Sequence, residues 1–255
     1  MGKIFITSDT HFGHDREFLW SPRGFKNIFD HDETIIENWN SLVDPEDTVY
    51  HLGDIMLGDN THGMSCLSNL NGNIKVILGN HDTNTRIKLY ESLPNVEVIG
   101  YATIIKYKKY IFYLSHYPTM TSNLESSSHL REHTLNLFGH THQNTNFYNE
   151  IPFMYHVGVD SHNNCPILID EVIEEMHSKV QECIKFLDED AQQEKESGIW
   201  EIEIERPLRR GERSLLPQER RCNKCIYFPV ACGHSDQFNH CVQYKRDPPD
   251  GGYYG

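Results

Sequence analysis

The sequence contains no long apolar segment. None of its hydrophobic stretches approaches the roughly 18–20 consecutive apolar residues that a membrane-spanning helix requires. The opening residues, MGKIFITSDTHFGHD, lack the apolar stretch and the small-residue cleavage site of a secretory signal. Gly2 is not followed by a Ser or Thr at the sixth position, so the N-myristoylation pattern is missing too. We therefore expect a cytoplasmic protein without a membrane partner.

Positive charge is also scarce. The chain has 23 Lys and Arg against 37 Asp and Glu, a formal net charge of −14. Such a surface repels phosphate backbones, which argues against a protein that coats duplex DNA through a broad basic face. The exception is the stretch 206–224, with seven basic and two acidic residues. Pairing of its arginines with the acidic remainder of the chain is favoured over nucleic-acid binding.

Cysteine is sparse until close to the end of the chain, where four of the seven cysteines fall within twenty residues. This cluster consists of Cys222, Cys225, Cys232 and Cys241. In a chain without a secretory signal, such a cluster favours metal binding over disulfides. Four thiolates suffice for a closed tetrahedral zinc site, although only the first pair has a zinc-ligand spacing. A structural zinc is favoured over free thiols and over disulfides.

The order of apolar and polar segments predicts an α/β fold. Short β-like runs are separated by helical patterns, and paired strands follow later in the chain. The expected strands are 3–8, 48–52, 74–78, 101–107, 110–115 and 134–138. The expected helices are 33–43 and 171–187, the second with Asp170 as N-cap. This pattern indicates a two-sheet β-sandwich flanked by helices, with a small Cys-rich C-terminal module after it.

Polar residues with metal-binding chemistry follow several of these strands. They stand in the groups Asp9-x-His11, Gly53-Asp54, Gly79-Asn80-His81-Asp82, Ser115-His116 and Gly139-His140-Thr141-His142. Strand ends at one rim of a sheet place such side chains close together. Carboxylates, imidazoles and an amide oxygen suit hard-to-borderline divalent metals, and the lack of cysteine argues against a thiolate site. The glycines permit sharp turns and close approach of the backbone to the ions.

These blocks, in this order, resemble the calcineurin-like metallophosphoesterase superfamily, in particular its small bacterial and phage-type phosphoesterases. They are DTHFGH (9–14), IIENWNSLVDPEDTVYHLGD (35–54), LGNHD (78–82), SHYP (115–118), GHTH (139–142) and GVD (158–160). The resemblance covers about residues 1–175 and implies a phosphoester hydrolase. Residues 1–187 would then be the catalytic domain, 188–205 a linker and strand, and 206–255 a basic, Cys-rich tail that is a candidate zinc module.

The resemblance also implies a centre of two metal ions bridged by Asp54. Three ligands would complete the first site, namely Asp9, His11 and His142. Three others would complete the second, namely Asn80, His116 and His140. Two ions about 3.5–4 Å apart share a hydroxide that attacks phosphorus, and both polarise the phosphoryl oxygens.

Two further residues receive catalytic roles from the resemblance. His81 would act as general acid or stabilise the phosphoryl charge, and the alternative is an ordinary surface residue. Asp82 would hold the His81 imidazole in orientation, and the alternative is an N-cap for the next helix.

The surroundings of the centre are less determined by the sequence. His14 and Arg23 are candidates for binding substrate phosphate, against the alternative of a surface loop. Asp160 is expected to serve structural hydrogen bonding. The segment 119–133 is a candidate lid or substrate loop. Its specificity candidates are each expected to be solvated, namely His129, Arg131 and His133.

We expect a metal-dependent hydrolase of small phosphodiesters or phosphomonoesters, such as nucleotides or cyclic nucleotides. The alternatives are a nuclease guided by the stretch 206–224, and a non-catalytic scaffold that holds partners through its Cys-rich tail. Manganese is favoured for the mixed nitrogen and oxygen ligands, and iron, zinc or nickel fit as well. The sequence leaves the oligomeric state open.

Overall fold

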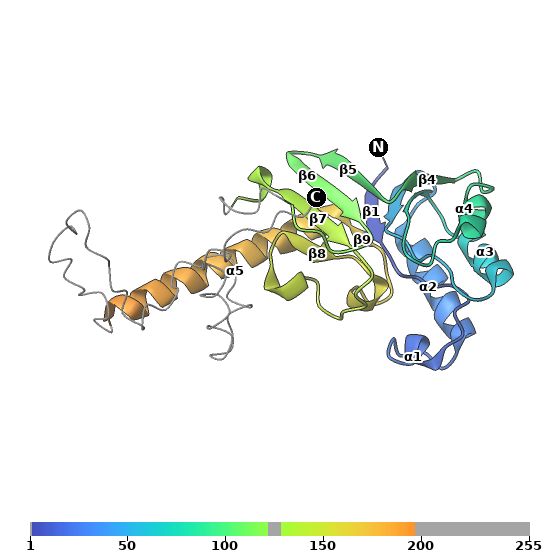
Figure 1. Ribbon diagram of the computed structural model, residues 1–255, viewed down its shortest axis with the longest axis horizontal. Helices are drawn as coiled ribbons and strands as arrows, with labels where there is room; N and C mark the ends of the chain where they lie inside the picture. The colour runs from blue at the N-terminus through green and yellow to red at the C-terminus, as the bar shows by residue number, and fades with distance from the viewer. Residues whose placement is uncertain (1, 122–128, 197–255) are drawn as a thin grey trace, which may run out of the picture. The chain divides into compact units, whose positions relative to one another are not determined.

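The computed structural model describes residues 2–121 and 129–196. Two β-sheets form the core of this part of the chain (Figure 1). The strands are β1 (Ile4–Thr7), β2 (Thr48–His51), β3 (Asn73–Ile77), β4 (Val96–Gly100), β5 (Ala102–Tyr107), β6 (Tyr110–Ser115), β7 (Thr134–Phe138), β8 (Met154–His156) and β9 (Ile167–Leu168). The first sheet has the order β4-β3-β2-β1-β9, with β1 to β4 parallel and β9 antiparallel. The second has the order β5-β6-β7-β8, in which only the β5–β6 hairpin is antiparallel.

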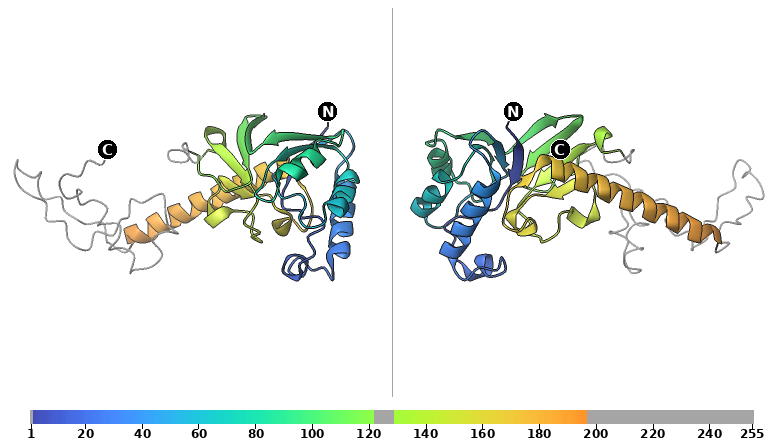
Figure 2. Two further views of the ribbon diagram at one scale, coloured as in Figure 1. Left: turned by 45° about the vertical axis from the view of Figure 1, so that its right-hand side comes forward. Right: turned by 180° about the vertical axis from the view of Figure 1, so that it is seen from behind.

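The helices connect these strands. They are α1 (Glu17–Trp20), α2 (Ile28–Leu42), α3 (Asn60–Ser68), α4 (Asn84–Tyr90) and α5 (Ile169–Glu196), with short 3-10 turns η1 (Leu130–Glu132), η2 (Tyr148–Glu150) and η3 (Val159–Ser161). α2 begins after Asn27, whose side-chain oxygen accepts hydrogen bonds from the backbone N–H groups of Phe29 and Asp30. α5 follows β9 directly and extends beyond the strands (Figures 1 and 2).

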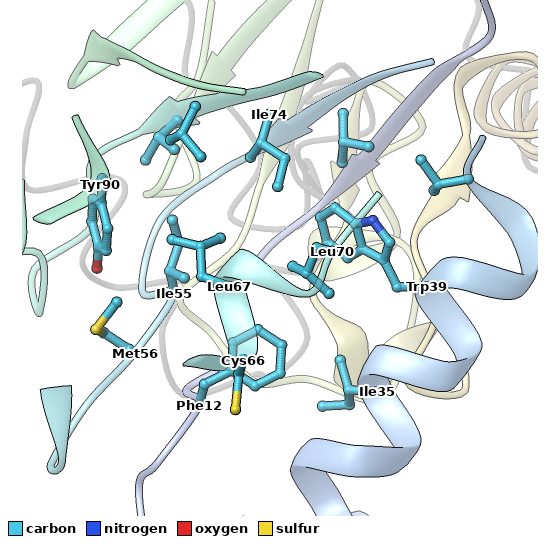
Figure 3. Close-up of a cluster of buried hydrophobic side chains, with 14 of the residues drawn as sticks. Phe12, Ile35, Trp39, Ile55, Met56, Cys66, Leu67, Leu70, Ile74 and Tyr90 are labelled. Carbon is cyan, nitrogen blue, oxygen red and sulfur yellow. The ribbon is translucent and has the colours of Figure 1, made fainter. Parts of the chain in front are cut away.

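The first sheet separates two apolar clusters. Because successive side chains of a strand point to opposite faces, neighbours in β1 enter different clusters. Phe5 packs with Trp39 of α2 and Leu67 of α3 in the cluster that Figure 3 shows. Ile6 packs with residues of the second sheet and of the first half of α5, including Phe112. The layers are therefore helices α2 to α4, the first sheet, and the second sheet with α5.

The parallel strand order brings the loops that carry polar residues to one edge. β1, β2 and β3 are adjacent and parallel, so the loops after them lie side by side. The second sheet reaches the same edge, because Ser8 forms a parallel bridge with Gly158 and the His140 N–H donates to Asp9 Oδ2. Segments from both sheets thus meet beyond the end of β1.

The predicted fold class, two sheets flanked by helices, is confirmed. The sequence missed the short helices α1 and α3 and the strands β4, β8 and β9, and it placed a helix after Asp82, where α4 lies, without giving its bounds. α5 begins at Ile169, so Asp170 lies in its first turn and not at its N-cap. The Asp170 carboxylate accepts hydrogen bonds from Lys108 Nζ and the Tyr107 hydroxyl.

α5 continues to Glu196, past the boundary expected at residue 187. Residues 197–205 of the expected linker and strand, the basic stretch 206–224 and the four tail cysteines lie outside the described residues, so these expectations stay predictions. Within 2–121 and 129–196, no helix is both long and apolar enough to cross a bilayer. The cytoplasmic location also stays a prediction.

The two-cluster core predicts how single truncations affect stability. Phe112 of β6 is fully buried between the sheets, so Phe112→Ala should lower the free energy of unfolding by about 3–5 kcal/mol. Ile104 on the adjacent strand is 59% exposed, and Ile104→Ala should change it by roughly 0.5 kcal/mol or less. Denaturant unfolding measures both, and equal losses would contradict the assignment of Phe112 to the core.

Candidate metal centre

Asp9, His11 and His142 form one group of ligand-type side chains at the end of β1. Their ligand atoms lie within 4.8 Å of one another. The Nε2 atoms of His11 and His142 are 3.2 Å apart, and each is 3.8 Å from Asp9 Oδ1. Burial raises the pKa of Asp9 although His142 and His116 act to lower it. Burial lowers the pKa of His11 well below its usual range. In both residues burial thus favours the neutral form, which is the protonated carboxyl of Asp9 and the deprotonated imidazole of His11.

Asp54, His116 and His140 form a second group beside the first. Their ligand atoms also lie within 4.8 Å of one another. His116 Nε2 lies 3.5 Å from Asp54 Oδ2 and 3.0 Å from Asn80 Oδ1. Asp54 Oδ2 is also 3.8 Å from His11 Nε2, so this carboxylate faces both groups. Burial would raise the pKa of Asp54, but hydrogen bonding and the charge of His116 lower it to about 2.

Hydrogen bonding at the far side of two imidazoles fixes which nitrogen faces the centre. His116 Nδ1 lies 2.7 Å from the Leu52 carbonyl, which can only accept, so Nδ1 carries a proton and Nε2 points inward. His142 Nδ1 lies 2.9 Å from Asp160 Oδ2 and has the same arrangement. A hydrogen bond of this kind sets the tautomer and the ring orientation of a metal-binding histidine.

The side-chain atoms that point into the centre are mostly hydrogen-bond acceptors, and too few hydrogen-bond donors lie near them. His116 Nε2 faces the oxygens of Asn80 and Asp54. Burial lowers the pKa of His116, but hydrogen bonding to Asp54 and the charges of Asp9 and Asp54 raise it by more, so the pKa lies above its usual value. Asp9 Oδ1 is buried and has no hydrogen-bond partner. Buried acceptors this close repel one another unless protons or a cation lie between them. Carboxylate, imidazole and amide ligands fit a hard-to-borderline divalent cation.

The backbone at the centre is strained. Five of the seven residues expected as ligands have positive φ, namely Asp9 (59°), His11 (50°), Asp54 (57°), His140 (67°) and His142 (47°). Non-glycine residues seldom adopt this left-handed region, which costs of the order of 1–3 kcal/mol each and clusters at functional sites. The turns aim the side chains back over the strand ends, which an extended continuation of each strand would not do.

Two glycines make room for the carboxylates. A Cβ at Gly79 would lie 2.2 Å from Asp54 Oδ1, and a Cβ at Gly139 would lie 2.3 Å from Asp9 Oδ2. The same oxygens accept backbone N–H groups, Asp54 Oδ1 from His81 and Asp9 Oδ2 from His140, both at 2.9 Å. The sequence predicted that these glycines allow close approach to the ions, and the structure shows them in contact with the two carboxylates.

Arg23 has a different role from the predicted contact with substrate phosphate. Its guanidinium forms two parallel hydrogen bonds with Asp160, of 2.8 and 2.9 Å, and its side chain is only 2% exposed. Arg23 also donates to the Asp9 carbonyl at 2.9 Å. Burial would raise the pKa of Asp160, but His142 and Arg23 hold it far below its usual range. Arg23 thus positions Asp160, which in turn orients His142.

Asp82 does not orient the His81 imidazole as predicted, because its oxygens serve other donors. Oδ2 accepts from the backbone N–H groups of Asp54 and Gly79, and Oδ1 accepts from the Tyr90 hydroxyl. The N-cap of α4 is Thr83, so the capping alternative for Asp82 is wrong as well. Asp82 instead ties the loop after β2 to the loop after β3.

His81 lies where the centre opens to solvent. Its Nε2 atom is 3.8 Å from Asp54 Oδ2, and its side chain is 40% exposed. His14 lies next to the first group, with its ring 5.7 Å from the His11 ring. Burial lowers the pKa of His14, and its Nδ1 has no hydrogen-bond partner. His14 therefore stays a candidate for substrate contact.

The segment 119–133 is described only in part, since 122–128 lie outside the described residues. His129 and Arg131 are exposed, as expected. His133 is buried and stacks on Phe153 with ring centroids 3.9 Å apart, so its expected solvation is wrong. Phe153 is the apolar partner that a local pattern could not reveal.

Two exposed aromatic rings beside the centre were missed by the sequence interpretation. Tyr117 is 49% exposed, and its ring lies 4.6 Å from the His140 ring. Phe18 is 73% exposed, and its ring lies 5.7 Å from the His14 ring. The available signal was that Tyr117 directly follows His116 in SHYP and that Phe18 stands four residues after His14 in DTHFGHDREF.

The family model of the calcineurin-like phosphoesterase superfamily domain matches residues 3–158, well over half of the chain. The chain belongs to this superfamily. An uncharacterized protein of Methanocaldococcus jannaschii, MJ1445, is 34% identical over 184 residues, 68% of this chain and 90% of that protein. The gene 66 protein of Mycobacterium phage L5 is 38% identical over 86 residues, 32% of this chain and 41% of the phage protein.

A solved structure supports the fold. The protein of unknown function AQ665 from Aquifex aeolicus is 25% identical, with a TM-score of 0.51, over 68% of this chain and 99% of that one. Calcineurin-like phosphoesterases generally use divalent metals, and this chain has candidate groups to hold them. Membership therefore supports metal-dependent phosphoester hydrolysis.

The hydrogen bond between Asp160 and His142 predicts an effect on metal affinity. Asp160→Asn removes the charge that pairs with Arg23 and weakens the acceptor that orients His142, so affinity for Mn²⁺ should fall about 10–100-fold. Equilibrium dialysis measures it. Asp15→Asn, an equal charge change at an exposed residue, is the control. Unchanged affinity in Asp160→Asn would show that His142 is held without Asp160.

Proposed function

We propose that this phosphoesterase holds two divalent cations, one in each group, with Asp54 as the shared ligand. The supporting observation is that Asp54 Oδ2 lies 3.8 Å from His11 Nε2 and 3.5 Å from His116 Nε2. Asn80 Oδ1 would join the second group through its position 3.0 Å from His116 Nε2. Manganese is the favoured metal for these ligands, and iron, zinc or nickel are alternatives.

Bound cations would lower the pKa of a water molecule and neutralise charge on the phosphoryl oxygens. The chain's own residues then supply position and proton transfer. The strained turns and the carboxylate hydrogen bonds hold the ligands in place before substrate arrives. His81 stands at the solvent edge, 3.8 Å from Asp54, where the leaving oxygen of a bound phosphoester would emerge. We assign it the proton donor to that oxygen.

We further propose that the substrate is a small phosphoester with a planar group, of the nucleotide or cyclic nucleotide class. Tyr117 and Phe18 present exposed rings on two flanks of the centre. Aromatic side chains stack on nucleobases irrespective of base identity. A net charge of −14 disfavours a long polyanion, so a small substrate is favoured over a nucleic-acid strand.

Several expectations continue as proposals. The tail cysteines Cys222, Cys225, Cys232 and Cys241 would hold a structural zinc. Nuclease action guided by the stretch 206–224, and a scaffold role without catalysis, are the alternatives to the proposed activity. The substrate panel described below distinguishes the nuclease and the scaffold from the proposed activity.

His81→Ala should lower kcat by about 10²–10⁴-fold while leaving the metal content near that of the wild type, because His81 acts on the leaving group and holds no ion. Steady-state kinetics and elemental analysis measure the two quantities. His177→Ala, at an exposed histidine of α5, should leave both unchanged. A wild-type kcat in His81→Ala would remove this residue from the mechanism.

The substrate class is tested with a panel of phosphomonoesters, phosphodiesters, cyclic nucleotides and oligonucleotides on Mn²⁺-loaded protein. Chelated protein is the control and should be inactive. Tyr117→Leu should raise the KM for nucleotides several-fold and leave the KM for glycerol phosphate esters unchanged, because only the former can stack. Preferred cleavage of oligonucleotides, lost on deletion of 206–255, would favour the nuclease. No turnover of any ester by loaded protein would favour the scaffold.

A further inference from the structure

A third cluster of metal-ligating side chains lies between α2 and α3, outside the groups around Asp54. Asp32 comes from α2, and His62 and Cys66 stand one turn apart on α3. Their ligand atoms lie within 4.8 Å of one another. His62 Nε2 is 2.8 Å from Asp32 Oδ2 and 3.5 Å from Cys66 Sγ, and Sγ is 3.9 Å from the same oxygen. Figure 3 shows Cys66 at the border of the apolar cluster.

The geometry differs from that of a nucleophilic Cys–His–Asp relay. A relay needs one imidazole nitrogen for the thiol and the other for the carboxylate. Here the carboxylate and the thiol both approach the same nitrogen, Nε2 of His62. One nitrogen cannot accept a proton from Cys66 while it donates one to Asp32. Three ligand atoms that converge on one point instead suit the binding of a metal ion.

The separations fit a tetrahedral ion. Zinc bonds of about 2.3 Å to sulfur and about 2.0–2.1 Å to nitrogen or oxygen place the ligand atoms about 3.3–3.6 Å apart. The three observed separations, 2.8, 3.5 and 3.9 Å, lie on both sides of this range. A rotation of the His62 side chain, which is 31% exposed, adjusts the shortest of them without moving the core.

Asp32 is held in place by contacts independent of His62 and Cys66. It is buried, its Oδ2 accepts the Gly13 N–H at 2.9 Å, and its Oδ1 lies 2.7 Å from His31 Nδ1. Arg23 Nη1 donates to His31 Nε2, so the His31 proton sits on Nδ1 and points at Asp32. A carboxylate ligand oriented in this way is pre-organised for a cation.

Access and the fourth ligand come from a surface hollow of about 420 Å³. His62, Asp32 and Cys66 line it together with Phe29, Glu33, Ile36, Glu37, Ser65 and Asn69. Water or the carboxylate of Glu33 or Glu37 would complete four ligands. Burial and the neighbouring Asp32 raise the pKa of Cys66 to about 12, so without a cation the sulfur keeps its proton and is a poor nucleophile. A cation that binds the thiolate takes the place of that proton.

We propose that Asp32, His62 and Cys66 form a zinc site that fastens the loop 9–14 to α2 and α3. Thiolate ligands select zinc over manganese or magnesium, so the selectivity of this site differs from that of the cysteine-free groups around Asp54. The link to the loop is the Gly13 N–H on Asp32 Oδ2. The proposal does not depend on the proposed substrate or on turnover.

The test uses the full-length protein loaded with Zn²⁺, and with Co²⁺ as a spectroscopic probe of thiolate ligands. Cys66→Ala and His62→Gln should each bind one zinc fewer per chain than the wild type. Cys66→Ala should also lose part of the near-ultraviolet cobalt–thiolate absorption. Cys165→Ala, at a half-buried cysteine outside the cluster, is the matched control and should change neither. Any contribution of the tail cysteines is common to all variants and cancels in the differences.

Zinc should also raise the Tm of the wild type more than that of either variant, because an ion that binds only the folded chain stabilises it. Should Cys66→Ala fail to fold, His62→Gln carries the test, since His62 is partly exposed. Equal zinc content and equal zinc-induced Tm shifts in the wild type and in the folded variants would overturn the site. If the wild type turns over no ester while both variants still bind one zinc fewer, only the proposed function is contradicted.

Discussion

The structure depends on one electrostatic constraint, the need for positive charge among buried acceptor atoms around Asp54. Asp54 Oδ2 faces nitrogens of His11 and His116, and Asp9 Oδ1 is buried without a donor. Burying such groups without compensation costs several kcal/mol. The arrangement persists because the strand order, the tight turns and the contacts of Gly79 and Gly139 leave these side chains no other position. The candidate metal ligands are therefore held together by the fold itself.

One arginine connects the centre to the rest of the fold. Arg23 holds Asp160, which orients His142, and it also donates to His31, which is bonded to Asp32. The same buried network therefore reaches from the candidate catalytic groups to the proposed zinc site. An arginine suits this position because its planar guanidinium keeps its charge and offers several donors in fixed directions. The loop 9–14 lies between the two sites and is tied to both.

The chemistry proposed for the centre follows from where it opens. His81 and the rings of Tyr117 and Phe18 lie at the solvent side, whereas Asp9, Asp54 and His116 are buried beneath them. Ions held below and a proton donor held above suit hydrolysis of a phosphoester that enters from solvent. The flanking rings supply apolar contact area to a protein that otherwise carries a large negative charge.

The sequence by itself determined the fold class, the family and which residues have metal-binding chemistry, because these are encoded in local patterns. A β-like run followed by Asp9, Asp54 or His116 is visible without coordinates. It did not determine what each residue contacts. Arg23 was predicted to bind phosphate and Asp82 to orient His81. Arg23 instead pairs with Asp160, far along the chain, and Asp82 accepts hydrogen bonds from the Asp54 N–H and the Tyr90 hydroxyl.

Only the tertiary structure decided the left-handed turns, the burial of His133 against Phe153, and the meeting of Asp32 with His62 and Cys66. For the turns, the reason is that packing of the sheets holds residues in a backbone region that they seldom adopt alone. For the contacts between side chains, the reason is their short range. A hydrogen bond, a stacked ring or a shared ligand point acts over a few ångströms, and residues far apart in sequence come that close only when sheets and helices pack. Composition and spacing in the sequence indicate which side chains have metal-binding chemistry, whereas the packing of sheets and helices determines which residues they contact.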